Sequence, residues 1–246
     1  ISLTPAGELV LSYAEKIMAL SDELDSRMGE MSGEIRGPLL IGASTTIGEW
    51  LLPALLSEFN ALYPQVRARL IVANSEQIET RIAGHALDLG LIEAPAKLNG
   101  VASEVCGSDE LVVVCAPDYP LPAGRSIAAK ALVDYEYIAR EPGSGTREAS
   151  DTYFRSHKID PQGLKVQMEL GSPEALKKVV QLGLGFAIVS RAVVAPEIEA
   201  KSLRMLTLKP SLKRSFQLIY PQEKFRTRLA DTFIDFAKHK LRELAV

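Results

Sequence analysis

The sequence predicts an α/β protein of two Rossmann-like lobes, joined by crossover strands and preceded by a long linker helix. Three observations predict this fold. The stretch from Thr4 to Met31 has a helical repeat of apolar residues. Strands and helices then alternate from Leu39 onward, as in α/β folds with largely parallel sheets. The alternation starts again after Pro117, which indicates a second lobe.

The N-terminal helix, within residues 1–33, is predicted to pair with another helix. Thr4 suits the N-cap and Pro5 the first helical position. Apolar residues at alternating steps of three and four form a seam: Val10, Tyr13, Ile17, Leu20 and Leu24. A single helix with so narrow an apolar side cannot bury that side by itself in water. We therefore expect a dimerisation helix, and the alternative is that the helix packs on its own domain. Glycines and a proline between Gly29 and Pro38 predict a hinge after it.

Lobe I is assigned to residues 37–116 and 211–246. Its expected strands cover 39–43, 67–73, 89–92 and 111–116, and its expected helices cover 47–62 and 75–83, with Ser75 capping the second. Asp109 and Glu110 are expected in a solvated loop before the last of these strands. A final strand over 215–220 and a helix over 227–244 fit either lobe, and we place them here.

Lobe II is assigned to residues 117–210. Its expected elements are helices near 128–133, 146–157 and 173–182 and strands over 135–139, 165–170, 186–189 and 203–208.

Three turns are the candidate ligand site. Ligands of open parallel sheets bind beyond the carboxyl ends of the strands, where the next helix presents unpaired backbone N–H groups. The turns that fit are Ser44, Thr45 and Thr46; Gly143, Ser144, Gly145, Thr146 and Arg147; and Gly171, Ser172 and Pro173. Helix N-termini favour negative charge, so a small anion is the expected ligand. One such turn is commonly only a helix cap, whereas three in two lobes favour a site.

Arg147 and Glu93 give this site its expected charges. Arg147 offers a planar fork for a carboxylate, a sulfur oxyanion or a phosphate, and the glycines at 143 and 145 allow close backbone approach. Glu93 follows a predicted strand and departs from an all-donor site. It either neutralises Arg147 in the empty state, binds an amino group or hydroxyls of the ligand, or is a surface carboxylate near Pro95.

The composition and charge of the chain indicate which partners and cofactors are expected. The net charge of −3 and the pI near 5.8 give no footprint for nucleic acid, so this chain is not expected to hold DNA by itself. Two cysteines, Cys106 and Cys115, and three scattered histidines favour a reducing cytoplasm without a metal or other cofactor. No apolar run has the length of a membrane span, which predicts a soluble protein without a membrane partner. No nucleophile elbow or Walker loop occurs, and the Gly183–Gly185 segment lacks a dinucleotide fingerprint, so we expect no enzyme.

Several motifs in order resemble LysR-type transcription regulators. They are Leu3–Gly7 with Ala14, Gly37–Thr46, Leu52–Pro64, Asp88–Ile92 and Gly183–Ser190. The resemblance covers essentially the whole chain. It implies a type 2 periplasmic-binding-protein-like effector domain, with the effector between its lobes and a homodimer or homotetramer formed through paired linker helices and lobes. It also implies that DNA is bound only through an N-terminal winged helix-turn-helix, which this sequence lacks.

The segment Arg140–Glu148 is similar to the branch that regulates carbon fixation and sulfur assimilation. By that likeness the effector is a phosphorylated metabolite or a sulfur oxyanion such as sulfite or sulfate. A solute-binding protein of a transport system is the alternative, since the same cleft would serve it. The N-terminal helix discriminates the two, because a secreted receptor needs a leader and no pairing helix.

Overall fold

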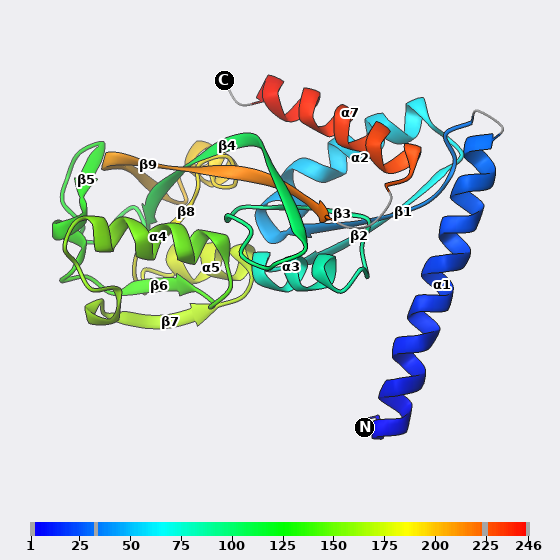
Figure 1. The fold of residues 1–246 in the computed structure, drawn as a ribbon. Coiled ribbons are helices and arrows are strands. Elements are labelled where there is room, and N and C mark those ends of the chain that lie inside the picture. Colours follow the sequence, from blue (N-terminus) through cyan, green and yellow to red (C-terminus); the bar gives the residue numbers. More distant parts are fainter. Residues whose placement is uncertain (1–2, 32–33, 223–225, 245–246) are drawn as a thin grey trace.

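The computed structural model describes residues 3–31, 34–222 and 226–244 and has the expected α/β architecture. Two lobes lie end to end, and the N-terminal helix projects away from them (Figure 1). This helix, α1, spans Pro5–Met31, and the Thr4 Oγ1 atom accepts a hydrogen bond from the Gly7 N–H at 3.1 Å. The five seam residues are each at least 58% exposed. Within the described residues, α1 therefore does not bury its seam on its own lobes.

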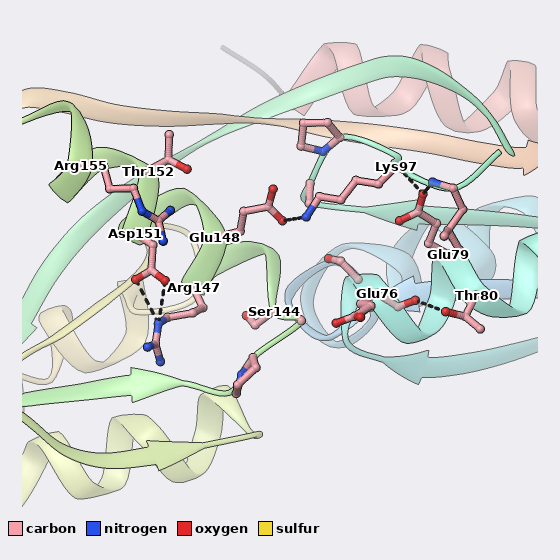
Figure 2. A pocket seen from close by; sticks show the side chains of 16 residues that line it. Glu76, Glu79, Thr80, Lys97, Ser144, Arg147, Glu148, Asp151, Thr152 and Arg155 are labelled. Carbon is pink, nitrogen blue, oxygen red and sulfur yellow. Dashed lines mark hydrogen bonds and ion pairs between the residues drawn. The ribbon is translucent and has the colours of Figure 1, made fainter. Parts of the chain in front are cut away.

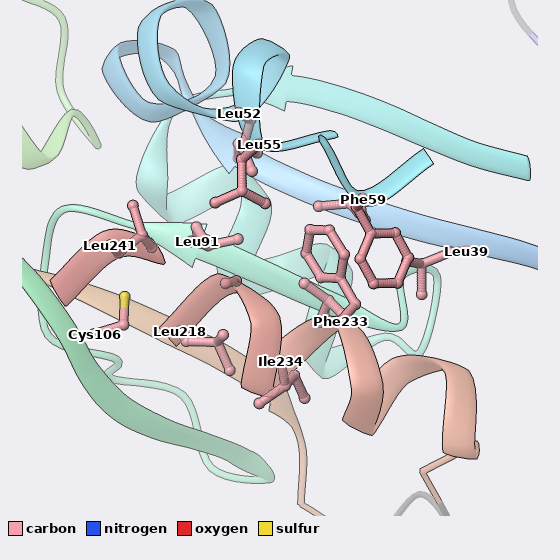
Figure 3. Packing of buried hydrophobic residues seen from close by; sticks show 14 of the residues in the cluster. Leu39, Leu52, Leu55, Phe59, Leu91, Cys106, Leu218, Phe233, Ile234 and Leu241 are labelled. Carbon is pink, nitrogen blue, oxygen red and sulfur yellow. The ribbon is translucent and has the colours of Figure 1, made fainter. Parts of the chain in front are cut away.

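Lobe I is built on three parallel strands. Their order is β2 (Val66–Ala73), β1 (Gly37–Ser44) and β3 (Leu89–Ile92). The helices α2 (Leu52–Leu62) and α7 (Arg228–Leu244) cover one face, and α3 (Ser75–Ala83) covers the other (Figure 1). Phe59 and Phe233 meet edge to face, with ring centroids 5.0 Å apart, in the core between α2, α7 and the sheet (Figure 3).

Lobe II has a small parallel sheet of its own, formed by β6 and β7. Its elements are β5 (Ser126–Ala128), β6 (Tyr137–Arg140), α4 (Gly145–Ser156), β7 (Val166–Leu170), α5 (Pro173–Gln181), β8 (Ala187–Ser190), α6 (Ala195–Glu199) and the 3₁₀ turns Ala129–Leu132 and Pro161–Gly163. The Phe186 carbonyl accepts a hydrogen bond from the Ile138 N–H at 2.8 Å, which ties β6 to the segment leading into β8.

Two long antiparallel strands, β4 (Val101–Cys115) and β9 (Arg204–Pro221), run through both lobes. The sequence predicted only the end of β4 and split β9 in two. The expectation that Asp109 and Glu110 lie in a solvated loop was wrong, because both pair within the β4–β9 ladder. These two charged residues interrupt the run of apolar residues from which the strand was predicted.

The hydrophobic cores change partway along these crossover strands. The first core is that of lobe I, around Phe59, and the second is that of lobe II, around Phe154. On β4, Cys106 packs in the first core, whereas Leu111 packs in the second. On β9, Phe216 belongs to the first core and Leu212 to the second. We propose that the lobe boundaries lie inside β4 and β9, earlier than residue 116 on the first strand and slightly later than residue 211 on the second.

Two helix starts differ from expectation. The predicted helix over 47–62 opens with a π-helical turn, Ile47–Leu51, before α2. The cap of α3 is Asn74 and not Ser75, because the Asn74 Oδ1 atom accepts a hydrogen bond from the Gln77 N–H at 2.9 Å. Ser75 is the first helical residue, and its hydroxyl oxygen accepts a long bond, 3.5 Å, from the Glu93 N–H.

Replacing Asn74 with Ala is expected to lower the free energy of unfolding by about 1 kcal/mol, the usual contribution of an N-cap. Chemical denaturation followed by circular dichroism measures this loss. Ser75→Ala is the matched control and should cost less. Equal losses in the two variants would refute Asn74 as the cap.

Candidate functional site

The first and third predicted turns meet at the guanidinium of Arg140, the last residue of β6. The Arg140 Nη2 atom donates to Thr45 Oγ1 at 3.1 Å and to the Gly171 carbonyl at 3.4 Å. Thr45 lies in lobe I and Gly171 in lobe II, so this side chain spans the gap between lobes. Its side chain is only 3% exposed.

Arg140 was not among the site residues predicted from the sequence. The available signal was its place at the carboxyl end of a predicted strand, next to the glycine turn. Its counter-ion is Glu141, whose oxygens accept from Nε at 2.8 Å and from Nη2 at 3.0 Å. A partly exposed carboxylate therefore occupies the Nε and Nη2 side of this buried guanidinium.

The first turn carries buried donors. Ser44 and Thr46 are buried, and Thr45 is half-buried. The Ser44 hydroxyl is enclosed and has no hydrogen-bond partner among the described residues. The same holds for the indole N–H of Trp50, in the π-helical turn that follows. Buried donors without partners are costly, and an acceptor oxygen would satisfy them.

The second turn brings the two lobes together. Gly143 has a φ of +83°, and its carbonyl accepts from the Glu76 N–H of α3 at 3.2 Å. A Cβ on Gly145 would lie 2.9 Å from the Glu93 backbone carbon. The close approach expected between these glycines and a ligand is an approach between lobes in this structure. Ser144 is buried and immediately precedes α4.

Arg147 is held inside lobe II. Its Nε atom donates to Asp151 at 3.0 Å, and its Nη1 atom donates to Glu169 at 2.8 Å and to the Arg140 carbonyl at 3.0 Å. Burial lowers the pKa of Arg147, but bonds with Glu169 and Asp151 raise it above its usual value overall. The fork expected to receive an anion is thus occupied by carboxylates of its own lobe.

Glu93 does not neutralise Arg147; its partner is Arg214 of β9. The Arg214 Nη1 atom lies 2.6 Å from Glu93 Oε2 and 2.8 Å from Thr146 Oγ1. Its Nη2 atom lies 2.8 Å from Asp109 Oδ2. All three charged side chains are at most 6% exposed. Burial raises the pKa of Asp109, although Arg214 opposes the shift.

This cluster of Arg214, Glu93, Asp109 and Thr146 joins lobe I, both crossover strands and lobe II. Glu93 follows β3, Asp109 lies on β4, and Thr146 lies in the first turn of α4. The Glu93 Oε1 atom is buried without a partner among the described residues. Sequence reasoning placed Glu93 and Thr146 near the cleft but could not supply Arg214.

The third turn caps α5. The Ser172 Oγ atom accepts from the Ala175 N–H at 3.4 Å, and Pro173 is the first helical residue. Ser172 therefore serves as a cap, as a single turn of this kind commonly does.

A cavity of about 510 Å³ lies between α3 of lobe I and α4 of lobe II (Figure 2). Its wall mixes charges, because Glu76, Asp151 and Arg155 line it together with Arg147. Lys97 and Glu148 form a 2.6 Å ion pair across it. A second cavity of about 380 Å³ lies between α4 and β9 and is lined by residues that include Glu93 and Arg214.

Neither a metal site nor a membrane helix is found in the part of the chain that the structure describes. No group of three or more His, Cys, Asp or Glu side chains there could hold a metal ion. No described helix combines the length and the apolar character that crossing a bilayer requires. Both cysteines are free and buried, and burial raises the pKa of the Cys106 thiol to about 11.

Two α/β lobes joined by paired crossover strands, with helix N-termini facing the gap between them, define a ligand-binding domain of the periplasmic-binding-protein-like class. The family model described as "LysR substrate binding domain" matches residues 32–242. The chain belongs to the LysR family of transcriptional regulators.

Relatives and solved structures agree with this assignment. The chain is 33% identical over 236 residues to a "Probable RuBisCO transcriptional regulator" of Cyanidium caldarium, covering 94% of this chain and 74% of that protein. It is 34% identical over 231 residues to the "Uncharacterized HTH-type transcriptional regulator YeiE" of Escherichia coli K12, with 94% and 76% covered.

Among solved structures, the CcmR regulatory domain of Synechocystis PCC6803 in complex with 2-PG matches with a TM-score of 0.76 at 30% identity, over 84% of this chain and 98% of that one. The effector-binding domain of QuiR in complex with shikimate has a TM-score of 0.77 at 20% identity, over 86% and 100%. The second likeness supports the fold alone.

Proposed function

We propose that this chain is the effector-sensing and oligomerisation part of a LysR-type DNA-binding regulator, and that it binds a small anionic metabolite between its lobes. The observation that carries the proposal is the buried guanidinium of Arg140, which contacts Thr45 of one lobe and Gly171 of the other. An anion bound to this guanidinium in lobe II would lie next to Thr45 of lobe I.

Charge-assisted hydrogen bonds explain why an anion suits this place. Arginine binds carboxylates and phosphates through parallel N–H groups, and Glu141 already engages Arg140 in this way. An incoming anion would replace Glu141 as the acceptor. The enclosed Ser44 hydroxyl would supply a further donor. Thr46, Ser144, Thr146 and Ser172 remain proposed members of the site, with Arg147 and the two glycines shaping it.

Phosphorylated metabolites are the first class of effector to test. The CcmR domain, 30% identical to this chain, was solved with 2-PG, which is 2-phosphoglycolate. Sulfite and sulfate remain candidates because they offer the same acceptor oxygens. A transport receptor is disfavoured, because the exposed seam of α1 suits a partner helix and the relatives are regulators.

The proposed mechanism is a shift in lobe arrangement. A ligand moves such an equilibrium only by its differential affinity for the two arrangements. The contacts that join the lobes, among them Arg140 with Thr45 and Lys97 with Glu148, are those that the effector would strengthen or replace. In the complete cytoplasmic regulator, the change would pass through paired α1 helices of a homodimer or homotetramer to winged helix-turn-helix heads, which alone would contact DNA.

Thermal shift and titration calorimetry with 2-phosphoglycolate, sulfite, sulfate and inorganic phosphate test this function. A ligand selective for the native state raises the melting temperature by mass action. We expect Arg140→Gln to weaken binding by at least about tenfold, since a hydrogen bond to a charged group contributes roughly 1.5–3 kcal/mol.

Arg147→Gln is the matched variant, and we expect a smaller loss from it because its fork is held by Asp151 and Glu169. A loss of affinity in Arg147→Gln alone would show that Arg147, and not Arg140, binds the anion. Unchanged melting with all four anions would refute the anion-binding proposal.

A further inference from the structure

A contact between the lobes, apart from the anion contacts, pairs Trp50 with Lys177. The Lys177 Nζ atom lies 4.7 Å from the centroid of the Trp50 ring. Trp50 belongs to the π-helical turn after β1 in lobe I, and Lys177 belongs to α5 in lobe II. The contact therefore joins the two helical elements that directly follow the first and third predicted turns.

Lys177 is fixed within its own lobe. Its side chain is 2% exposed, and its Nζ atom lies 2.7 Å from both Glu174 Oε1 and Glu197 Oε1 and 3.2 Å from the Val193 carbonyl. Burial lowers the pKa of Lys177, but these carboxylates raise it overall, so the ammonium stays charged. Lobe II thus presents a rigid cation to the ring of lobe I.

Trp50 depends on the other lobe for this contact. Its indole N–H is buried without a hydrogen-bond partner among the described residues, so the ring is not anchored through its polar atom. Cation–π contacts are strongest when desolvated and when the ring is tryptophan. Separating the lobes would remove the cation from the ring while leaving Lys177 bound to Glu174 and Glu197.

We propose that Trp50 and Lys177 form an interlobe latch that favours the arrangement in which Arg140 reaches both Thr45 and Gly171. The proposal rests on the proposed anion-sensing function for its consequence, since the latch would hold together the two turns that the anion contacts. The latch itself can be tested without any anion, because the chain has a single tryptophan and all indole emission comes from Trp50.

Lys177→Met removes the cation and keeps a side chain of similar length. We expect acrylamide to quench Trp50 emission more strongly in this variant than in the parent chain. We also expect the Kd for 2-phosphoglycolate to rise by about 2- to 30-fold, the factor that corresponds to a cation–π contact. Lys177→Arg restores a cation and should recover both properties.

Lys178→Met, on the exposed side of the same helix, is the control and should behave like the parent chain. Trp50→Leu removes the ring from the opposite lobe, so it should raise the Kd as Lys177→Met does, whereas Trp50→Phe removes the indole N–H but keeps an aromatic face, so it should change the Kd less. Quenching unchanged by Lys177→Met, or a raised Kd in Lys177→Met but not in Trp50→Leu, would overturn the latch. If the parent chain does not bind 2-phosphoglycolate, that effector is refuted, and the quenching series alone decides the latch.

Discussion

Replacing Arg214 with Leu is expected to lower the free energy of unfolding by about 3–5 kcal/mol, the usual loss when one partner of a buried ion pair is removed. Arg214 lies 2.6 Å from Glu93 and 2.8 Å from Asp109. Both carboxylates are almost fully enclosed, so removing the guanidinium leaves two buried negative charges without a counter-ion. Urea denaturation followed by circular dichroism measures the loss.

Arg191→Leu provides the control for this prediction. Arg191 makes a 2.7 Å ion pair with Glu110, but its side chain is 55% exposed. Such pairs contribute at most about 1 kcal/mol. In a triple variant, Arg214→Leu with Glu93→Gln and Asp109→Asn, we expect part of the stability to return, because no carboxylate stays charged. Equal losses for Arg214→Leu and Arg191→Leu would contradict this account.

The same cluster explains what sequence reasoning could not reach. Asp109 and Arg214 are 105 positions apart and meet only because β4 and β9 pair along their length. When only a short stretch of sequence is considered, a charged residue such as Asp109 indicates a solvated loop. That inference fails where a distant strand supplies the counter-ion that allows the charge to be buried. The crossover strands were therefore predicted too short.

Sequence signals predicted helices and strands correctly where the structure depends on neighbouring residues. The cap at Thr4 and the apolar repeat predicted α1, and the buried run at Leu89–Ile92 gave β3 with its observed bounds. These features depend on backbone groups within one or two turns. The same logic placed a helix start at or just after each of the three predicted turns, but only the second of these turns lines the two cavities described above.

The choice between two arginines needed the structure. Arg140 and Arg147 are seven positions apart around one turn, and both suit an anion. Asp151 lies four residues after Arg147 on α4, within reach on the same helix face, whereas Arg140 lies at the end of a buried strand. Spacing alone could have flagged Asp151, but only the packing of Thr45 against Arg140 puts that guanidinium between the lobes.

The double substitution Ile17→Asp with Leu24→Asp is expected to abolish the assembly that we propose forms through α1. Both side chains lie on the seam of the 27-residue helix α1 and are 66% and 59% exposed, so the lobes of the same chain leave them uncovered. A helix with a narrow apolar seam becomes stable by packing that seam on another helix. Two carboxylates in such a seam would be buried without partners, which costs several kcal/mol.

Multi-angle light scattering measures the mass of the assembly, which should fall in the double variant. Leu11→Asp with Met18→Asp is the matched control, because these residues are also exposed and seven positions apart but lie beside the seam. It adds the same charge to the same helix, so it should keep the parent mass. A parent mass in the seam variant, or the same decrease in both, would remove the seam from the interface. The outcome decides whether α1 can carry a change in lobe arrangement from one chain to another.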